Sequence, residues 1–154
     1  MSPDNLVKQM IIEKINDYVG IISAKDWNKT LFDALIPLPD GTTYNSYIIK
    51  AKEKTVLIDT VDTDMANQFI DTLKYNNIEK IDYIVVNHAE QEHLGALPLV
   101  LKKFPEAMII TNESCKNLLE SHLEIDKDKF IVISDGDSFP IGNKTLKFIK
   151  NDSI

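Results

Sequence analysis

The chain contains no arginine. All 17 basic residues are lysines, so no planar guanidinium group is available to bind phosphate or carboxylate groups through two parallel hydrogen bonds. The 24 acidic residues give a formal net charge of −7. Nucleic-acid binding normally depends on a positively charged surface, so this composition argues against a nucleic-acid partner.

Cysteine and long apolar runs are also scarce. Cys115 is the only cysteine, which excludes an intrachain disulfide and a CxxC pair, and we expect it to pack on a helix. No apolar run approaches the roughly 18 residues that a membrane span needs. The first five residues lack the basic and apolar regions of a secretion signal. We therefore expect a cytoplasmic protein without a membrane partner.

Length and composition fit one domain that spans residues 1–154. A chain of this size can bury roughly 68–70% of its unfolded surface, which is enough for one core. The hydrophobic content of 44% and the charged content of 27% are ordinary for a globular protein. No internal repeat or linker-like tract divides the sequence.

Strand-like and helix-like segments alternate along the sequence. Runs of β-branched and aromatic residues predict strands, the first two of which form a hairpin. The expected strands are 44–49, 55–59, 81–86, 108–110, 130–133 and 144–149. Apolar residues at helical spacing predict helices at 64–75, 95–104 and 113–122. This alternation predicts an α/β fold.

The first expected helix has the clearest pattern. Met65, Phe69 and Leu73 are spaced four apart and therefore share one helical face. Asp62 and Asp64 lie near its start and are candidates for capping it. We expect this helix to pack on the sheet.

The most distinctive segment is 88–93, which follows the expected strand 81–86. It holds two imidazoles and two carboxylates, on His88, Glu90, Glu92 and His93. Such a set without a thiolate favours iron or manganese over structural zinc. In an extended segment alternate residues share a face, so His88 and Glu90 can bind one ion. As the chain turns into the next helix, Glu92 and His93 can reach a second ion.

The alternative interpretation is a polar loop whose surface histidines lie near glutamates by chance. The position of the segment favours metal binding, because open α/β sheets bind their ligands at the carboxyl ends of the strands. Two of the three histidines of the chain also lie within these six residues.

The motif resembles the iron-binding signature of flavodiiron proteins, whose metallo-β-lactamase relatives more often have His-x-His-x-Asp-His. As in that family, the motif is followed by Gly95, Ala96, Leu97 and Pro98. Other segments resemble the family's regions around its first hairpin and its later Gly-Asp turn. They are residues 35–47, 58–61, 135–137 and 144–146. The resemblance extends from about residue 15 to residue 149.

The resemblance implies an incomplete metallo-β-lactamase-like αββα sandwich, comprising the N-terminal half to two-thirds of that fold. It also implies a diiron centre that reduces dioxygen or nitric oxide with electrons from a flavin or a rubredoxin-type donor. Carried over by position, His88 and Glu90 bind one iron, and Glu92 and His93 bind the other.

Three features differ from the family's pattern. Glu92 replaces the usual Asp, and Leu94 occupies a position that is often Ser. The family's remaining metal ligands lie beyond the strand that matches 144–149, and its flavodoxin domain has no counterpart in this sequence. We therefore expect no FMN site in this chain and no activity of the isolated chain.

Several other residues have two interpretations. Asp59 is either an outer-shell partner of a metal-binding histidine or a turn-forming residue. Trp27 is expected to be an aromatic anchor that packs the N-terminal segment, and the less favoured alternative is a place in a substrate pocket. His122 is expected on the surface near a helix end. Tyr44 and Tyr47 point to opposite faces of their strand, so at most one of them faces a site.

Three functions are compatible with these observations. The first is part of a metal-dependent oxidoreductase, and the second is a metal-binding or interaction module without turnover. The third is a hydrolase, against which Glu90 argues because hydrolases of this group usually have His there. We also expect a two-fold homodimer, because the strand 81–86 would otherwise expose an apolar face to water.

Overall fold

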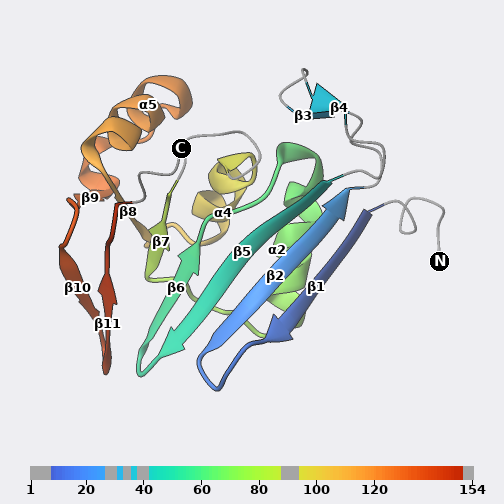
Figure 1. Cartoon of the computed structure of the whole chain (residues 1–154), viewed down its shortest axis with the longest axis horizontal. Helices are drawn as coiled ribbons and strands as arrows, with labels where there is room; N and C mark the ends of the chain where they lie inside the picture. The colour runs from blue at the N-terminus through green and yellow to red at the C-terminus, as the bar shows by residue number, and fades with distance from the viewer. Residues whose placement is uncertain (1–7, 27–30, 33–35, 38–41, 88–93, 151–154) are drawn as a thin grey trace.

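The structure is a computed structural model that describes residues 8–26, 31–32, 36–37, 42–87 and 94–150. Its main feature is a seven-stranded sheet (Figure 1). In spatial order the strands are β1 (Lys8–Lys14), β2 (Val19–Asp26), β5 (Thr42–Ala51), β6 (Lys54–Ile58), β7 (Tyr83–Val85), β8 (Met108–Thr111) and β9 (Phe130–Val132). The strands from β1 to β6 are antiparallel, and those from β6 to β9 are parallel.

The remaining elements are helices and two short ladders. The helices are η1 (Thr63–Met65), α2 (Ala66–Tyr75), α4 (Leu97–Lys103), α5 (Glu113–Leu123) and η2 (Lys127–Lys129). The ladders are β3 (Leu31–Phe32) with β4 (Ile36–Pro37), and β10 (Ser138–Ile141) with β11 (Lys144–Lys147).

The predicted α/β fold is confirmed. Each of the six expected strands and three expected helices overlaps an observed element, although their ends shift by a few residues. Pro98 is the second residue of α4, where its missing N–H costs no helical hydrogen bond. Asp62 is at the N-cap of η1, but its side chain makes no capping hydrogen bond, so its predicted capping role is wrong.

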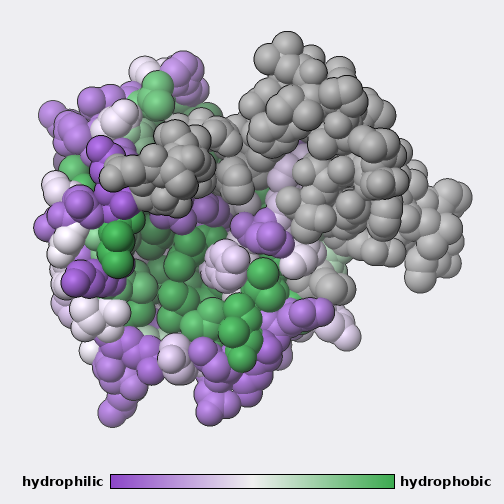
Figure 2. Space-filling view, viewed as in Figure 1, coloured by the Kyte–Doolittle hydropathy of each residue, from purple (hydrophilic) through white to green (hydrophobic). Residues whose placement is uncertain are grey.

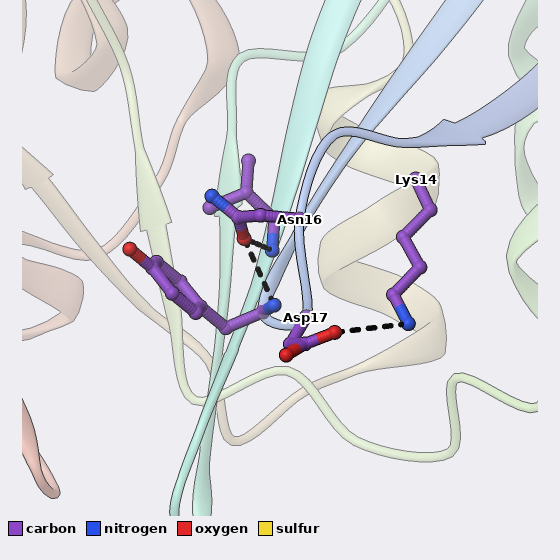
Figure 3. Close-up of polar contacts among 5 residues, drawn as sticks. Lys14, Asn16 and Asp17 are labelled. Carbon is purple, nitrogen blue, oxygen red and sulfur yellow. Dashed lines mark hydrogen bonds and ion pairs between the residues drawn. The ribbon is translucent and has the colours of Figure 1, made fainter.

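The turn between β1 and β2 is stabilised by the side chain of Asn16 (Figure 3). Its Oδ1 accepts hydrogen bonds from the backbone N–H groups of Tyr18 and Val19, each at 2.9 Å. Lys14 and Asp17 form an ion pair of 3.5 Å across the same turn. A side-chain amide that satisfies two backbone donors fixes the hairpin that adds β1 to the edge of the sheet.

One face of the sheet is covered by helices. The strand register aligns Ile48, Leu57, Ile84 and Ile109 in a row across four strands, and all four are buried in the helix-side core. The predicted apolar face of α2 packs against this side of the sheet. Phe69 and Leu73 of α2, and Met65 at the end of η1, have no exposed surface.

The opposite face of the sheet carries a second apolar row. Its members, in register across five strands, are Ile21, Tyr47, Ile58, Val85 and Ile110. Figure 2 views this face and shows apolar side chains gathered over its middle. Val85 and Ile110 are buried, whereas the other three are half-buried.

The hairpin of β10 and β11 covers part of this face. Ile141 is 1% exposed within the second apolar cluster, and the ring of Phe139 packs edge-on against Tyr83 with centroids 4.9 Å apart. The expectation that the strand 81–86 exposes a bare apolar face is therefore wrong. Its outward residues Tyr83 and Val85 lie in that cluster, beneath the hairpin.

The tip of the hairpin also contacts the turn between β5 and β6. Asn143 Oδ1 accepts a hydrogen bond of 2.8 Å from the Lys52 backbone N–H. Gly142 has φ of 68°, and a Cβ atom there would lie 2.1 Å from the Lys52 carbonyl oxygen. Only glycine permits this approach without displacing the backbone.

None of the helices in the part of the chain that the structure describes is long and apolar enough to cross a membrane.

Candidate metal centre

The four predicted metal ligands, His88, Glu90, Glu92 and His93, lie outside the described residues. The structure instead defines both flanks of this six-residue segment, which joins the end of β7 to the start of α4. Among the residues described, no group of three or more His, Cys, Asp or Glu side chains is arranged to hold a metal ion. Any metal centre with this ligand set therefore depends on how the flanks present residues 88–93.

The N-terminal flank is held by two hydrogen-bonded contacts. The Val86 N–H donates to the Ile110 carbonyl oxygen at 3.0 Å, which continues the pairing of β7 with β8. The next residue, Asn87, is bound by both carboxylate oxygens of Asp59. Its backbone N–H donates to Oδ1 at 2.9 Å, and its Nδ2 donates to Oδ2 at 3.1 Å. The residue that precedes His88 is thus fixed through its backbone and its side chain.

Asp59 is itself held firmly at the end of β6. Its φ of 59° lies in the left-handed region, which Asp tolerates better than most residues. Its N–H donates to the Val85 carbonyl at 2.8 Å, and its own carbonyl accepts a 2.8 Å hydrogen bond from Ser46 Oγ. The backbone therefore supports the turn-forming interpretation of this residue. The outer-shell interpretation stays a prediction, because His88 and the other predicted ligands lie outside the described residues.

The C-terminal flank is fixed by close backbone packing. The Ala96 N–H donates to the Val61 carbonyl oxygen at 2.9 Å. Gly95 lies so close to η1 that a Cβ atom there would be 2.0 Å from the Thr63 backbone nitrogen and 2.7 Å from Thr63 Oγ1. Glycine is required here by the close approach of two backbones.

Both flanks thus meet the same stretch of chain, residues 59–63. Every buried polar or charged residue that the structure describes lies in this region or on a strand beside it. These residues are Ser46, Asp59, Thr60, Asp62 and Thr111. Asp62 Oδ2 accepts a 3.2 Å hydrogen bond from Tyr44, and Thr111 donates to the Val86 carbonyl at 2.8 Å. A buried polar network at the carboxyl end of parallel strands is the position at which such sheets bind ligands.

Cys115 lies beneath this network on α5 and is 6% exposed, as its predicted packing role requires. Burial raises the pKa of its thiol, and a hydrogen bond with Thr111 opposes that rise. The charge of Asp59 raises the pKa further. The thiol is therefore protonated at neutral pH, which argues against a role as a nucleophile or metal ligand.

The other residues that carry an expectation from the sequence lie in the core, on the surface or outside the described residues. Tyr44 is 2% exposed in the helix-side core, whereas Tyr47 is in the row on the opposite face, so the predicted alternation is confirmed. His122 is exposed in the last turn of α5, as expected. Trp27 lies outside the described residues. Leu94 is 7% exposed in the helix-side core, so it anchors the end of the segment.

Asn87 and Thr63 position the segment but were not identified by the sequence reasoning. Asn87 immediately precedes the first histidine, yet an amide in that place gives no local signal of its partner Asp59, which is 28 residues away. The Gly95 that follows the motif was a visible signal. A glycine at the start of a helix indicates either a turn or a close backbone contact.

The substitution Asp59→Asn is expected to weaken metal binding about tenfold, because outer-shell groups that orient ligands typically contribute at least that factor. Both groups of Asn87 that face this side chain are N–H donors, so an amide that places its N–H₂ group opposite one of them loses one of the two hydrogen bonds. Asparagine also tolerates the left-handed backbone, so the fold is retained. Anaerobic calorimetric titration with iron(II) measures the effect.

Asp82→Asn is the matched control. Asp82 also binds a backbone N–H group, that of Thr55 at 2.8 Å, but it does so at the opposite end of β7. This variant is expected to bind iron(II) as the unmodified chain does. Equal weakening by both substitutions would show that Asp59 acts only through general stability.

The chain is similar to a known protein family over most of its length. The model of the ODP family beta lactamase matches residues 42–152 of this chain. The match begins with β5 and includes the whole segment from Asp59 to α4.

Curated relatives include two named for redox activities. The chain is 38% identical over 139 residues to an anaerobic nitric oxide reductase flavorubredoxin of Aliivibrio salmonicida, covering 88% of this chain and 28% of that protein. It is 37% identical over 143 residues to a coenzyme F420H(2) oxidase of Methanocaldococcus jannaschii, covering 89% and 34%. The chain thus spans about a third of the length of these relatives.

Solved structures show the same relationship. A flavoprotein from Thermotoga maritima superposes with a TM-score of 0.87 at 33% identity, covering 92% of this chain and 36% of that chain. The rubredoxin oxygen:oxidoreductase of Desulfovibrio gigas gives 0.84 at 32% identity, covering 91% and 35%. These likenesses confirm the predicted resemblance and the predicted partial metallo-β-lactamase-like fold.

Proposed function

The chain belongs to the ODP family of β-lactamase domains, and from this membership we propose that residues 88–93 form the metal-binding loop of a flavodiiron-type domain. In this proposal His88 and Glu90 bind one iron, and Glu92 and His93 bind a second. The domain then serves the reduction of dioxygen or nitric oxide, as the names of its relatives suggest.

The observation that carries this proposal is the anchoring of residues 88–93 at both ends. Asp59 holds Asn87 on one side, and Gly95 packs on Thr63 on the other. Both anchors contact the short stretch 59–63, so the two ends of the segment are fixed against the same part of the chain. Bringing four metal-binding side chains together costs conformational entropy. Fixing both ends of a six-residue segment lowers that cost.

The donor set fits iron. Two imidazoles and two carboxylates without a thiolate suit iron better than structural zinc. When bound, such ions supply electron transfer to a small oxidant. The protein's own contribution is to hold the ligands and to orient them through outer-shell hydrogen bonds, and Asp59 and Asn87 are in position to do so.

The residues at positions 92 and 94 both differ from the family's usual residues, and the two differences have different consequences. Leu94 is buried in the core next to the segment 88–93. A leucine in place of the family's polar residue therefore changes the packing there and not the set of metal ligands. Glu92 is one methylene longer than the usual Asp. Its carboxylate therefore reaches further from the backbone than that of Asp, and we propose that the metal site accommodates this extra length.

Electrons are proposed to come from a flavin or a rubredoxin-type protein. The flavorubredoxin and rubredoxin oxygen:oxidoreductase relatives carry such a donor or acceptor in their names. The buried polar residues at the carboxyl end of the parallel strands flank the segment 88–93 and support a site near that edge of the sheet.

Metal analysis of the purified chain, followed by assays of oxygen and nitric oxide consumption with an artificial reductant, tests this function. Iron together with consumption of either oxidant supports the proposal. Iron without consumption favours a metal-binding or interaction module. Zinc with esterase or lactamase activity would identify a hydrolase and overturn the proposal.

We also propose that the 154-residue chain forms a homodimer through the uncovered part of the sheet face. Ile21, Tyr47 and Ile58 form a half-buried apolar row there, beside the area that the β10–β11 hairpin covers. At roughly 25 cal/mol per Å², covering about 400 Å² per chain contributes on the order of 10 kcal/mol per chain before association costs. A two-fold axis lets the same row pack on itself.

Sedimentation equilibrium at micromolar concentration tests this assembly. The unmodified chain is expected to sediment as a dimer, and Ile58→Lys as a monomer, because a lysine in the row must be desolvated in the interface. Tyr75→Lys is the control, since Tyr75 is 87% exposed on α2, on the other side of the sheet. An unmodified chain that remains monomeric would contradict this proposal.

A further inference from the structure

A cavity of about 900 Å³ lies on the helix side of the molecule, away from the open sheet face. Its walls come from the η1–α2 region, the start and middle of α4, and the last turns of α5. Figure 1 shows α4 between α2 and α5. This volume is within the range of small-molecule sites, which is roughly 300–1,000 Å³.

The walls of the cavity are mainly apolar. Five of the lining residues are leucines, which come from α4, from α5 and from position 94, ahead of α4. They are Leu94, Leu99, Leu118, Leu119 and Leu123. Leu118 is 44% exposed, so it lies at the mouth, whereas Leu119 is 2% exposed and belongs to the core. An apolar wall that reaches from the core to the surface suits an aliphatic chain.

The charge of the lining is opposite to the charge of the protein. None of the Asp and Glu residues that the structure describes lines the cavity, and the described lining residues that can ionise are Lys102 and His122. Lys102 forms no ion pair with any residue that the structure describes. A lysine beside an apolar wall favours an anionic head group on an apolar ligand.

The cavity is also lined by the polar residues His122, Thr63 and Asn67. The ring Nδ1 of His122 lies 2.9 Å from the Leu118 carbonyl oxygen, which can only accept, so Nδ1 carries the proton of that hydrogen bond. Thr63 and Asn67 add neutral hydrogen-bonding groups on the side of η1 and α2. One cation, few polar groups and a leucine-lined wall match a carboxylate with a single alkyl chain better than a sugar or a nucleotide.

We infer that this cavity is a binding site for a medium-chain aliphatic carboxylate, with its alkyl chain among the leucines of α4 and α5 and its carboxylate at Lys102. Leu94 and Gly95 are shared by the cavity and by the C-terminal anchor of residues 88–93. An occupant of the cavity therefore contacts the residues that hold that segment. The inference does not depend on metal binding and stands if the proposed redox function fails.

Titration of the isotopically labelled chain with octanoate, followed by amide NMR spectra, tests the site. We expect saturable binding of one octanoate, with shifts at Leu99, Lys102, Leu119 and His122. The neutral analogue 1-octanol is expected to bind more weakly. Shifts centred on Ile58 would locate the ligand on the open sheet face and overturn the proposal, as would an absence of saturation.

Two variants separate the cavity from general charge effects. Lys102→Gln is expected to weaken octanoate binding about threefold to fivefold, which is the range for one partly exposed ion pair. Lys103→Gln removes the same charge from the next residue of α4, which does not line the cavity, and is expected to leave binding unchanged. Equal weakening by both variants would show nonspecific attraction and contradict the site.

A third variant tests the mouth of the cavity. Leu118→Asp places a like charge where the ligand enters, and since Leu118 is exposed the fold should tolerate it. Loss of octanoate binding with an unchanged circular dichroism spectrum supports the site. Unchanged binding in this variant would overturn it.

Discussion

The variants His88→Ala and His93→Ala are each expected to lose metal binding while the chain keeps its fold. Four donors shared between two ions leave two protein ligands for each, so removing one leaves a single ligand. Outer-shell changes alone typically cost 10–100-fold in affinity, so losing a ligand should weaken iron(II) binding by more than about 100-fold. Calorimetric titration gives the affinity, and circular dichroism reports the fold.

His122→Ala is the matched control for these two variants. It removes the third histidine of the chain, which is exposed on α5 and bonded to the Leu118 carbonyl. Iron(II) binding should be unchanged in this variant. If either His88→Ala or His93→Ala unfolds the chain, these histidines have a structural role and the proposed assignment fails.

Gly95→Ala is expected to lower the free energy of unfolding by about 3 kcal/mol, the upper part of the usual range for overpacking. The added Cβ would lie 2.0 Å from the Thr63 backbone nitrogen, far inside van der Waals contact. Its two nearest neighbours are backbone atoms of residues 62 and 63, which cannot move aside as a flexible side chain can. Since this contact anchors residues 88–93, iron(II) binding should weaken as well.

Gly20→Ala controls for the general effect of adding a methyl group. Gly20 is also buried, but its nearest Cβ neighbours are side-chain methyl groups of Ile48 and Ile12 at 3.2 and 3.4 Å, which can adjust. Its free energy of unfolding should change by less than about 1 kcal/mol. Urea denaturation measures both variants, and equal destabilisation would show that the contact of Gly95 with η1 is not special.

The part of the fold with strong periodicity was predictable from the sequence. The strand 44–49 alternates outward and inward residues, and α2 buries Phe69 and Leu73 on one face, next to Met65 of η1, so both elements were recognised. Their bounds were less accurate. The strand extends to Thr42–Ala51 because it pairs with β2 on one side and β6 on the other, and pairing across the sheet is not visible locally.

The strands β1, β2 and β10 were not predicted. In β1 the charged residues Lys8, Glu13 and Lys14 flank only a short apolar run, and the strand is stable because it pairs with β2 at the sheet edge. β10 contains Pro140, which weakens a strand assignment, yet an edge hairpin tolerates proline. In each case tertiary pairing decided the conformation and local propensity did not.

The residue types of the candidate metal centre could be predicted from the sequence, but the contacts that hold its flanking residues could not. The cluster of metal-binding side chains in residues 88–93 can be recognised from the sequence because imidazoles and carboxylates rarely occur so close together. The bond between Asp59 and Asn87, and the contact of Gly95 with Thr63, join residues about 30 positions apart and emerge only from the folded chain. The sequence therefore predicts which residues bind metal, and the fold shows what holds the residues on either side of them.

The three histidines of the chain allow a direct test of the central claim, that residues 88–93 bind iron. Side-chain imidazole NMR signals of the labelled chain would be followed during addition of substoichiometric iron(II) without oxygen. We predict that the signals of His88 and His93 broaden or shift first, while that of His122 persists. Broadening of all three signals together, or of His122 alone, would contradict the claim.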